Sequence, residues 1–313
     1  MLVFSLLSFV YLSATALAAT YSQSDSYRGK DFLSGFTHWD IADPTHGRVN
    51  YVGQNEALAQ NLTFTSGDTL IIRTDDKTVL DPSGPGRNSV RLYSNKKYKN
   101  HVTVWNIRHM PEGCGTWPAV WESGESWPDE GEIDILEGVN DKGLNRASLH
   151  TTSGCTMPAS RTMTGTSVGD NCDVAATGNG GCGVSSNNAK SYGPAFNKAG
   201  GGFYAMERSD AGVKIWFWRR SSCKIPSDVL SGATQIDTDK WSTPFAAFPS
   251  DSCDMGSHFG PHSIIINLTL CGDWGAAAFN SDGCPGDCIT YVDQNPGAFG
   301  NAYFDVAWLK IYE

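Results

Sequence analysis

The chain has 313 residues, 33 of them acidic and 23 basic, which gives a formal net charge of −10 at pH 7. This negative field repels phosphate backbones, so we expect no nucleic-acid partner. Charged residues make up only 18% of the chain and aromatic residues 11%, a composition that suits contact with an uncharged polymer.

The first 18 residues have the features of a secretory signal peptide. Residues 2–17 form an apolar run broken only by small or hydroxyl residues, and Ala16-Leu17-Ala18 offers a small-residue cleavage site. A membrane anchor is the alternative, but spanning a bilayer takes about 20 apolar residues, and no later segment approaches that length. We therefore expect an exported protein without a membrane partner, with a signal peptide over 1–18 and one domain over 19–313.

Helical signals are scarce, whereas short strand-like runs recur along the chain. Each run is rich in β-branched or aromatic residues and is bounded by Gly, Pro, Asn, Asp or Ser. The predicted strands are 69–74, 89–93, 101–107, 147–151, 203–207, 213–218, 262–270 and 303–312. Many short strands without alternating helices predict an all-β sandwich or jelly roll.

Two of these runs also indicate where they lie in a sheet. In 213–218, Val213, Ile215 and Phe217 share one face, while the other face carries Trp216 and Trp218. That pattern is typical of a strand with one core face and one aromatic face that is not purely apolar. Residues 303–312 are apolar on both faces, as in a central strand.

Asn-x-Thr sequons at Asn61 and Asn267 are candidate glycan acceptors. Asn61 precedes a Ser-Gly-Asp turn and is the predicted glycosylation site. Asn267 lies inside the apolar run 264–268, which predicts a buried strand, so we expect no glycan there.

One segment concentrates carboxylates: Trp127-Pro-Asp-Glu-Gly-Glu132-Ile-Asp134-Ile-Leu-Glu137-Gly. On a helix, residues five apart point about 140° away from each other, so Glu132 and Glu137 would not converge. The flanking glycines and the Ile-x-Ile pattern also disfavour a helix. On a strand, Glu132 and Asp134 share one face while the isoleucines face the core.

A regular strand would then send Leu136 outward and Glu137 into the core. One extra residue near Ile135–Leu136, a β-bulge, returns Glu137 to the face of Glu132 and buries Leu136. Retaining glycoside hydrolysis requires two carboxyl groups about 5–5.5 Å apart, which such a face could supply. The alternative is a solvated acidic strand face. The Trp127-Pro128 pair before the strand and the glycines on either side of it disfavour this alternative.

Residues 164–202 are rich in Gly, Asn and Ser, and a loop of this length is functional or disordered. Because cysteines lie inside it, we expect an ordered, disulfide-stapled loop.

In an exported chain the nine cysteines predict disulfides, and their odd number leaves at least one thiol unpaired. No His or Cys cluster completes a tetrahedral metal site with Cys284 and Cys288, and we expect neither a metal nor a cofactor. The cysteines are Cys114, Cys155, Cys172, Cys182, Cys223, Cys253, Cys271, Cys284 and Cys288.

The pattern Glu132-x-Asp134-x-x-Glu137 resembles the signature of glycoside hydrolase family 16, laminarinase type. Nearly the whole chain from Asp43 onward is similar to fungal endo-1,3(4)-β-glucanases. The resemblance implies a concanavalin A-like β-jelly roll with an open cleft across its concave sheet. It also implies a retaining endo-β-glucanase acting on 1,3- or mixed 1,3/1,4-linked β-glucans, and we expect this secreted protein to be a monomer. The other similar motifs are Gly115-Thr-Trp117-Pro-Ala-Val-Trp121, Leu149-His150-Thr151 and Cys271-Gly-Asp-Trp274.

The resemblance assigns the nucleophile to Glu132 and the acid/base to Glu137, with Asp134 hydrogen-bonded to the nucleophile. It also places His150 beside these carboxylates, although a lone histidine is more often structural. Three neighbouring carboxyls cannot all ionise freely, so one pKa must rise, and the sequence does not say which. The resembling glucanases lack a cysteine at Cys223, so we expect this thiol to be unpaired and the other eight cysteines to form four bridges.

Six further side chains are candidates for substrate binding. Trp121, Trp127 and Trp274 flank the motifs above, and we expect their rings to stack on sugars, with burial in the core as the alternative. The three polar candidates could contact sugar hydroxyls, but ordinary surface or strand-pairing roles fit them equally well. These candidates are Asn50, Arg73 and Arg91.

Two other functions stay open. A cell-wall glucan transglycosylase of the same fold would transfer the sugar to another sugar, but related fungal transglycosylases resemble a shorter Glu-x-Asp-x-Glu pattern. A non-catalytic glucan-binding jelly roll is also possible, because a fold does not define a function. The intact acidic triad argues against a pure binding module.

Overall fold

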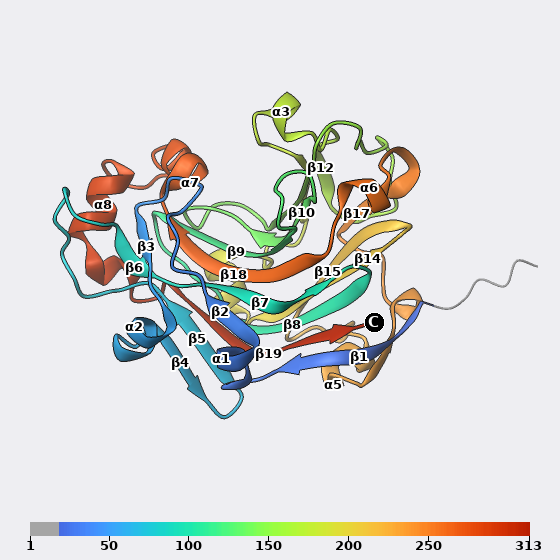
Figure 1. Ribbon diagram of the computed structural model, residues 1–313, viewed down its shortest axis with the longest axis horizontal. Coiled ribbons are helices and arrows are strands. Elements are labelled where there is room, and N and C mark those ends of the chain that lie inside the picture. Colours follow the sequence, from blue (N-terminus) through green and yellow to red (C-terminus); the bar gives the residue numbers. More distant parts are fainter. Residues whose placement is uncertain (1–18) are drawn as a thin grey trace, which may run out of the picture.

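The computed structural model describes residues 19–313, and the predicted signal peptide lies outside this range. The described chain forms two packed, largely antiparallel β-sheets with short helices at their margins (Figure 1). This arrangement confirms the predicted all-β sandwich.

The eight-stranded sheet carries the carboxylate segment. Its strand order is β12-β13-β11-β10-β9-β18-β7-β2, and all pairings are antiparallel. Its strands are β2 (Phe36–His38), β7 (Arg91–Tyr98), β9 (Thr116–Ser123), β10 (Glu132–Glu137), β11 (Arg146–His150), β12 (Thr166–Gly169), β13 (Cys182–Ser185) and β18 (His262–Leu270).

The nine-stranded sheet packs beneath it, in the order β16-β1-β19-β8-β14-β15-β17, with β5 and β4 attached through β19. A separate parallel pair joins β3 (Val49–Tyr51) to β6 (Arg87–Ser89). The strands of the larger sheet are β1 (Thr20–Tyr27), β4 (Thr63–Ser66), β5 (Thr69–Arg73), β8 (His101–His109), β14 (Gly202–Ser209), β15 (Gly212–Arg219), β16 (Gln235–Asp237), β17 (Ala246–Pro249) and β19 (Tyr303–Tyr312).

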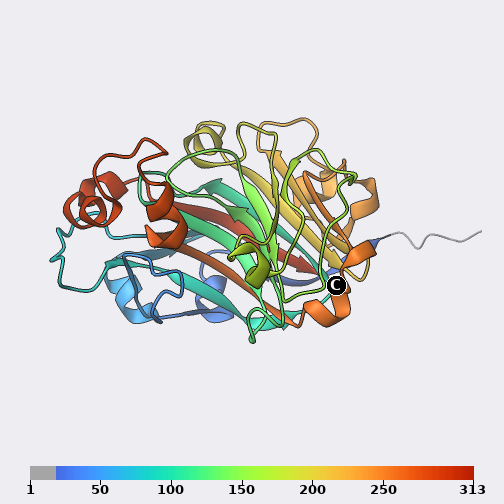
Figure 2. The same cartoon turned by 90° about the horizontal axis from the view of Figure 1, so that it is seen from above.

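The helices are short and lie around the strands. Seen from above, α7 and α8 lie at one end of the molecule and α6 at the other (Figure 2). None of the described helices is long and apolar enough to cross a membrane. They are α1 (Asp31–Gly35), α2 (Gln54–Ala59), α3 (Val174–Thr177), α4 (Gly193–Lys198), α5 (Ser227–Ser231), α6 (Met255–His258), α7 (Gly272–Ala278) and α8 (Cys288–Gln294), with 3-10 turns η1 (Thr238–Lys240), η2 (Ser250–Ser252) and η3 (Pro296–Phe299).

Strand alternation supplies the main core between the sheets. Val120 and Ile133 from the eight-stranded sheet join Trp105 and Tyr204 from the nine-stranded sheet in one fully buried cluster. A second buried cluster lies on the outer face of the nine-stranded sheet, where α5 and β16 contribute to it. The large sheet is thus covered on both faces.

The predicted strands are confirmed, although 89–93 spans the end of β6 and the start of β7. The interpretation of 164–202 as one long loop is wrong. Its small residues form β12 and β13, which extend the edge of the eight-stranded sheet, together with α3 and α4. Glycines such as Gly169 and Gly183 masked the strand signal, because they carry no β-branched side chains.

The expected cysteine chemistry is confirmed: eight cysteines pair and Cys223 is free and exposed. The bridges are Cys114–Cys284, Cys155–Cys253, Cys172–Cys182 and Cys271–Cys288.

The predicted glycan acceptor, Asn61, is exposed and lies in a turn after α2, with a left-handed φ of 59°.

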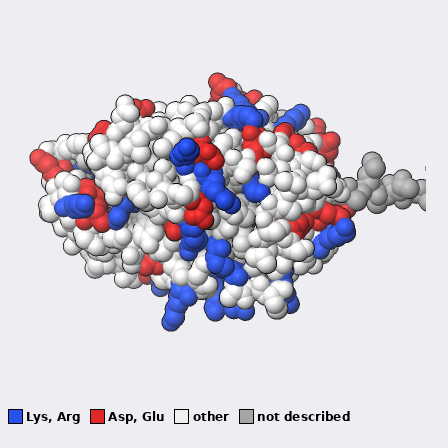
Figure 3. Space-filling model, turned by 90° about the horizontal axis from the view of Figure 1, so that it is seen from below, with Lys and Arg blue, Asp and Glu red and all other residues white. Residues whose placement is uncertain are grey.

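Charges on the underside of the molecule are mixed. In Figure 3, Lys and Arg are interspersed with Asp and Glu and separated by wide uncharged areas. This face therefore presents no continuous field of one sign.

Candidate active site

β10 changes its alternation partway along because of a β-bulge. Opposite β9, Asp134 pairs with Trp121 and Leu136 pairs with Val120, so Ile135 is the extra residue. Ile135 and Leu136 are both 0% exposed, and the next side chain returns to the outer face. The predicted bulge is therefore confirmed, and it brings three carboxylates to one face.

β11 adds a histidine to this face. In the β10–β11 ladder, Glu132 lies opposite His150 and Asp134 lies opposite Ser148. Nε2 of His150 is 3.2 Å from Oδ2 of Asp134, and both side chains are almost completely buried. The central carboxylate is therefore held between the glutamates and the imidazole.

Glu137 is oriented by an aromatic pair. Trp117 Nε1 donates a hydrogen bond to Oε1 of Glu137 at 2.9 Å. Trp274, on α7, packs edge-on against Trp117 with ring centroids 5.7 Å apart. The guanidinium carbon of Arg146 lies 5.8 Å from the centroid of the Trp274 ring. Two tryptophans and an arginine thus line the site next to Glu137.

All three carboxyl groups have raised pKa values. Burial, followed by repulsion from Asp134, raises the pKa of Glu132 to about 8. Burial also raises the pKa of Asp134 and the pKa of Glu137, while the Trp117 hydrogen bond acts in the opposite direction on Glu137. Burial therefore favours the protonated form of all three carboxyl groups relative to free carboxylic acids.

Glu132, Asp134 and His150 could also hold a cation, because their ligand atoms lie within 4.8 Å of one another. Three protein ligands with an open position are typical of a catalytic metal site. A bound cation would, however, compete with the hydrogen bond between the carboxyl groups of Glu132 and Asp134.

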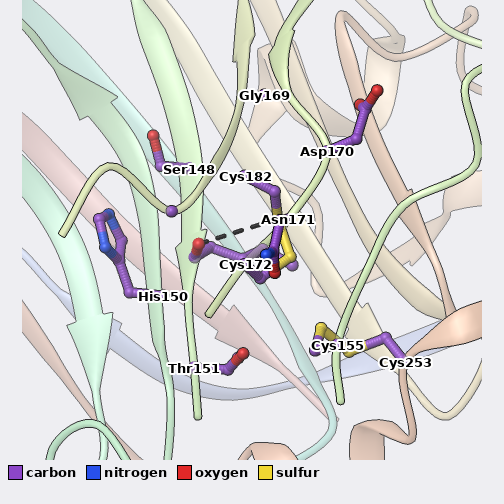
Figure 4. Close-up of a disulfide and its surroundings, with 12 residues drawn as sticks. Ser148, His150, Thr151, Cys155, Gly169, Asp170, Asn171, Cys172, Cys182 and Cys253 are labelled. Carbon is purple, nitrogen blue, oxygen red and sulfur yellow. Dashed lines mark hydrogen bonds between the residues drawn. A yellow bond between two sulfur atoms is a disulfide. The ribbon is translucent and has the colours of Figure 1, made fainter. Parts of the chain in front are cut away.

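A loop stapled by a disulfide packs against His150 (Figure 4). Cys172 and Cys182 close this loop, and the N–H of Thr151 donates to the carbonyl of Cys172 at 2.9 Å. At Gly181, where φ is +58°, a Cβ would lie 3.0 Å from Nδ1 of His150. The close approach requires glycine, and it fixes one side of the imidazole.

The aromatic candidates lie at different depths. Trp127 is 46% exposed in the loop before β10. Trp121 is partly buried and donates from Nε1 to Asn267 Oδ1 at 2.7 Å. Arg91 is stacked between two rings, with its guanidinium carbon 4.6 Å from the Trp39 centroid and 4.9 Å from that of Trp121. Trp121 and Arg91 thus lie together on the outer face of the eight-stranded sheet.

The two other polar candidates make contacts within the protein. Arg73 lies on β5 of the opposite sheet and forms an ion pair with Asp76 at 2.5 Å, which fits the ordinary surface role that was the alternative to a contact with sugar hydroxyls. Asn50 donates to Asn88 Oδ1 at 2.7 Å across the β3–β6 pair, which is the strand-pairing alternative. Neither position could be inferred from the sequence, because it depends on which sheet each strand joins.

The sequence reasoning missed several residues that line or support the site. Arg146 and Ser148 share the alternation of His150 on β11, so strand parity could have identified them. Trp117 lies within the Gly115–Trp121 motif, but the sequence does not distinguish its contact with Glu137 from burial in the core. Asn145 carried no signal, because it ends a polar turn, yet its amide contacts β10.

The comparisons with known proteins agree with this geometry. A family model described as the XgeA-like catalytic GH16 domain matches residues 36–312. The chain therefore belongs to glycoside hydrolase family 16.

Among solved structures, the chain is 58% identical to laminarinase 16A from Phanerochaete chrysosporium, with a TM-score of 0.94, and the match covers 94% of this chain and all of that one. That enzyme was solved with β-glucans (6-O-glucosyl-laminaritriose) in its donor and acceptor sites. The chain is 38% identical to an elongating family 16 β-1,3-glucosyltransferase, with a TM-score of 0.88 and coverage of 94% and 100%.

Among curated proteins, a "Probable glycosidase" of Schizosaccharomyces pombe is 42% identical over 95% of this chain. An endo-1,3(4)-β-glucanase of Arthroderma benhamiae is 40% identical, also over 95% of this chain. The chain spans 70% of the length of the first protein and 65% of the second.

Proposed function

We propose that the protein is an exported, retaining endo-β-glucanase that hydrolyses 1,3- or mixed 1,3/1,4-linked β-glucans. The observation that carries this proposal is the bulged strand β10, which presents two glutamates on the face of a histidine-buttressed aspartate. The similarity to laminarinase 16A supports the substrate class. The signal-like N-terminus and the four disulfides support export.

In the proposed first step, Glu137 protonates the glycosidic oxygen while the carboxylate of Glu132 attacks the anomeric carbon. The bond to the leaving sugar breaks, and a covalent glycosyl ester forms on Glu132. In the second step Glu137 accepts a proton from water, and this water displaces the ester. Two displacements at one carbon retain the β configuration.

In the free enzyme the proton is favoured on Glu132, whereas the proposed mechanism needs it on Glu137. Burial raises the pKa of Glu132 to about 8, so the empty site favours a protonated nucleophile. The attack requires Glu132 to be ionised and Glu137 to carry the proton. Asp134 lies between them on the strand and contacts His150, so we propose that it relays the proton when substrate displaces water.

Further roles belong to the same proposal. Trp121, Trp127 and Trp274 stack on sugar rings, and Arg91 contacts sugar hydroxyls next to Trp121. Asn61 carries a glycan, residues 19–313 form one catalytic domain, and the enzyme acts as a monomer without a cofactor. All the carboxylates that the mechanism needs come from one chain, which supports a monomer.

The assignment of the two glutamates is tested with an activated aryl β-glycoside of laminaribiose, whose leaving group needs no proton. Azide should rescue Glu137→Ala on this substrate and give a β-glycosyl azide, because the covalent step on Glu132 remains. Glu132→Gln should lose at least about 10⁴-fold in kcat, as enzymes do when a nucleophile is removed. A β-azide formed by Glu132→Ala, with an α-azide or no rescue for Glu137→Ala, would reverse the two roles.

A glucan transglycosylase is the second candidate, because the chain is also similar to an elongating β-1,3-glucosyltransferase. In that reaction a sugar replaces water in the second step, and the carboxylates keep their roles. Chromatography of the products from laminarin, lichenan and cellulose separates the two reactions. Shortened chains indicate hydrolysis, whereas products longer than the substrate indicate transfer.

A further inference from the structure

Asn145, the residue before β11, is fully buried and uses all four of its polar groups. Its backbone N–H donates to Ser191 Oγ at 3.0 Å, and its carbonyl accepts from the N–H of Ser186 at 2.9 Å. Its side-chain Oδ1 accepts from the N–H of Glu137, and its Nδ2 donates to the carbonyl of Ile135, both at 2.9 Å. The side chain is therefore fixed by its own backbone and spans the bulge.

The bulge explains why β10 needs this amide. The ladder between β10 and β11 ends where Asp134 pairs with Ser148. Beyond that point the carbonyl of Ile135 and the N–H of Glu137 have no ladder partner on β11. A buried backbone group left unpaired costs about 1–3 kcal/mol, and one planar amide supplies both the missing donor and the missing acceptor.

The same contacts fix the direction of Glu137. Its backbone N–H is held by Asn145, and its carboxylate is held by Trp117 Nε1 at 2.9 Å. Without the first contact the bulge would relax, and the residue after Leu136 would turn away from the face that carries Glu132. We infer that Asn145 is the positioning residue for the proposed acid/base Glu137, an inference that rests on the proposed function.

The first test compares substrates that differ in their need for the acid. Asn145→Ala should lower kcat on laminarin about 100-fold with little change in KM, because a misplacement of about 1 Å can cost that much. On an activated aryl glycoside the glycosylation step should be nearly unchanged, and azide should accelerate turnover to a β-glycosyl azide. Equal losses on both substrates without azide acceleration would overturn the inference.

The conservative variant gives a second test that does not depend on the alanine variant folding. In Asn145→Asp a protonated carboxyl can still donate to the carbonyl of Ile135 and accept from the N–H of Glu137. When that carboxyl ionises, the donor is lost and a negative charge is added beside Glu137. The activity of Asn145→Asp relative to wild type should therefore fall as pH rises, whereas a constant ratio across pH would contradict the inference.

The chain offers a matched control in Asn197, whose side-chain amide also bridges a backbone N–H and a carbonyl. Its Oδ1 accepts from the N–H of Met110 and its Nδ2 donates to the carbonyl of Met110, both at 2.9 Å. Both Asn197→Ala and Asn145→Ala should lower the melting temperature of the protein. It should leave the substrate ratio and the response to azide unchanged.

A readout that does not depend on turnover separates this inference from the proposed function. ¹³C NMR titration of Glu137 should give a different pKa in Asn145→Ala than in wild type, because the carboxylate moves relative to Trp117 and Asp134. An unchanged titration would overturn the positioning role. If the wild-type protein cleaves no β-glucan, the proposed function fails, and this titration still decides the role of Asn145.

Discussion

The outer faces of the two sheets are both rich in tryptophan, yet they serve different purposes. On the nine-stranded sheet, Trp216 and Trp218 are only 3% and 5% exposed. Trp241 covers them edge-on, with ring centroids 5.0 and 5.4 Å away. On the eight-stranded sheet, Trp117 contacts the carboxylate of Glu137 from a face that no further layer of strands covers within residues 19–313.

The difference lies in what covers each face. The chain between β15 and β17 folds back as α5, β16 and η1 and closes the outer face of the nine-stranded sheet. The helices α6, α7 and α8 lie toward the two ends of the molecule, away from the middle of β10 (Figure 2). The number of tryptophans in a strand therefore does not locate a sugar-binding site. What locates it is whether a later segment of the chain folds over that face of the sheet.

The largest expected effect tests the covered face. Trp241→Ala should destabilise the protein by about 3–5 kcal/mol, because it opens a cavity over two buried rings. At temperatures where the variant stays folded, kcat and KM on laminarin should match wild type. Urea unfolding and steady-state kinetics measure the two quantities, and a loss of activity without a loss of stability would mean that this face takes part in function.

Removing a carboxyl from the open face should change how stability depends on pH. Folding raises the pKa of Glu132 from 4.5 to about 8, so the folded state binds more protons than the unfolded state between these values. Stability should therefore fall as pH rises through this window, and the penalty should be absent below its lower end. Glu132→Gln removes the group and should flatten the slope in thermal unfolding.

The control for that comparison is Glu56→Gln, which alters an exposed glutamate on α2. It should keep the wild-type slope. If Glu132→Gln and Glu56→Gln gave the same slope, Glu132 would not be the group that carries the pH dependence.

A smaller effect is expected on the exposed part of the open face. Trp127→Ala should raise KM for laminarin roughly two- to tenfold, if stacking on a sugar resembles stacking of two aromatic rings. Because the side chain is 46% exposed, stability should change by no more than about 0.5 kcal/mol. Calorimetry and kinetics on the same samples check this, and an unchanged KM would remove Trp127 from the binding surface.

The smallest effect concerns Cys223, which is exposed and unpaired. Mass spectrometry of the alkylated, unreduced protein should find a label on this cysteine alone. Cys223→Ser should change stability by less than about 0.5 kcal/mol and leave activity unchanged. A label on any other cysteine would contradict the four bridges.

Much of the site could be predicted because its signals are local. The alternation around Glu132 required a bulge whichever sheet the strand joined, and the odd cysteine count required a free thiol. Arg73 shows the limit, since nothing near it in the sequence says that β5 joins the opposite sheet. Asn145 shows another limit, because an asparagine after a turn usually satisfies its own loop, whereas here its amide completes a neighbouring strand.

The position of β19 has a consequence for how the protein is made. This strand follows every other strand in the sequence, yet it pairs with β1, β5 and β8 and lies between β1 and β8 in the sheet (Figure 1). Residues 303–312 must therefore leave the ribosome before the nine-stranded sheet can close. Since β1 and β19 are separated by most of the chain, this closure is a long-range event of the kind that slows folding. Until it happens, β1 and β8 expose unpaired edges, so assistance by chaperones is most valuable in the interval between synthesis of β8 and release of β19.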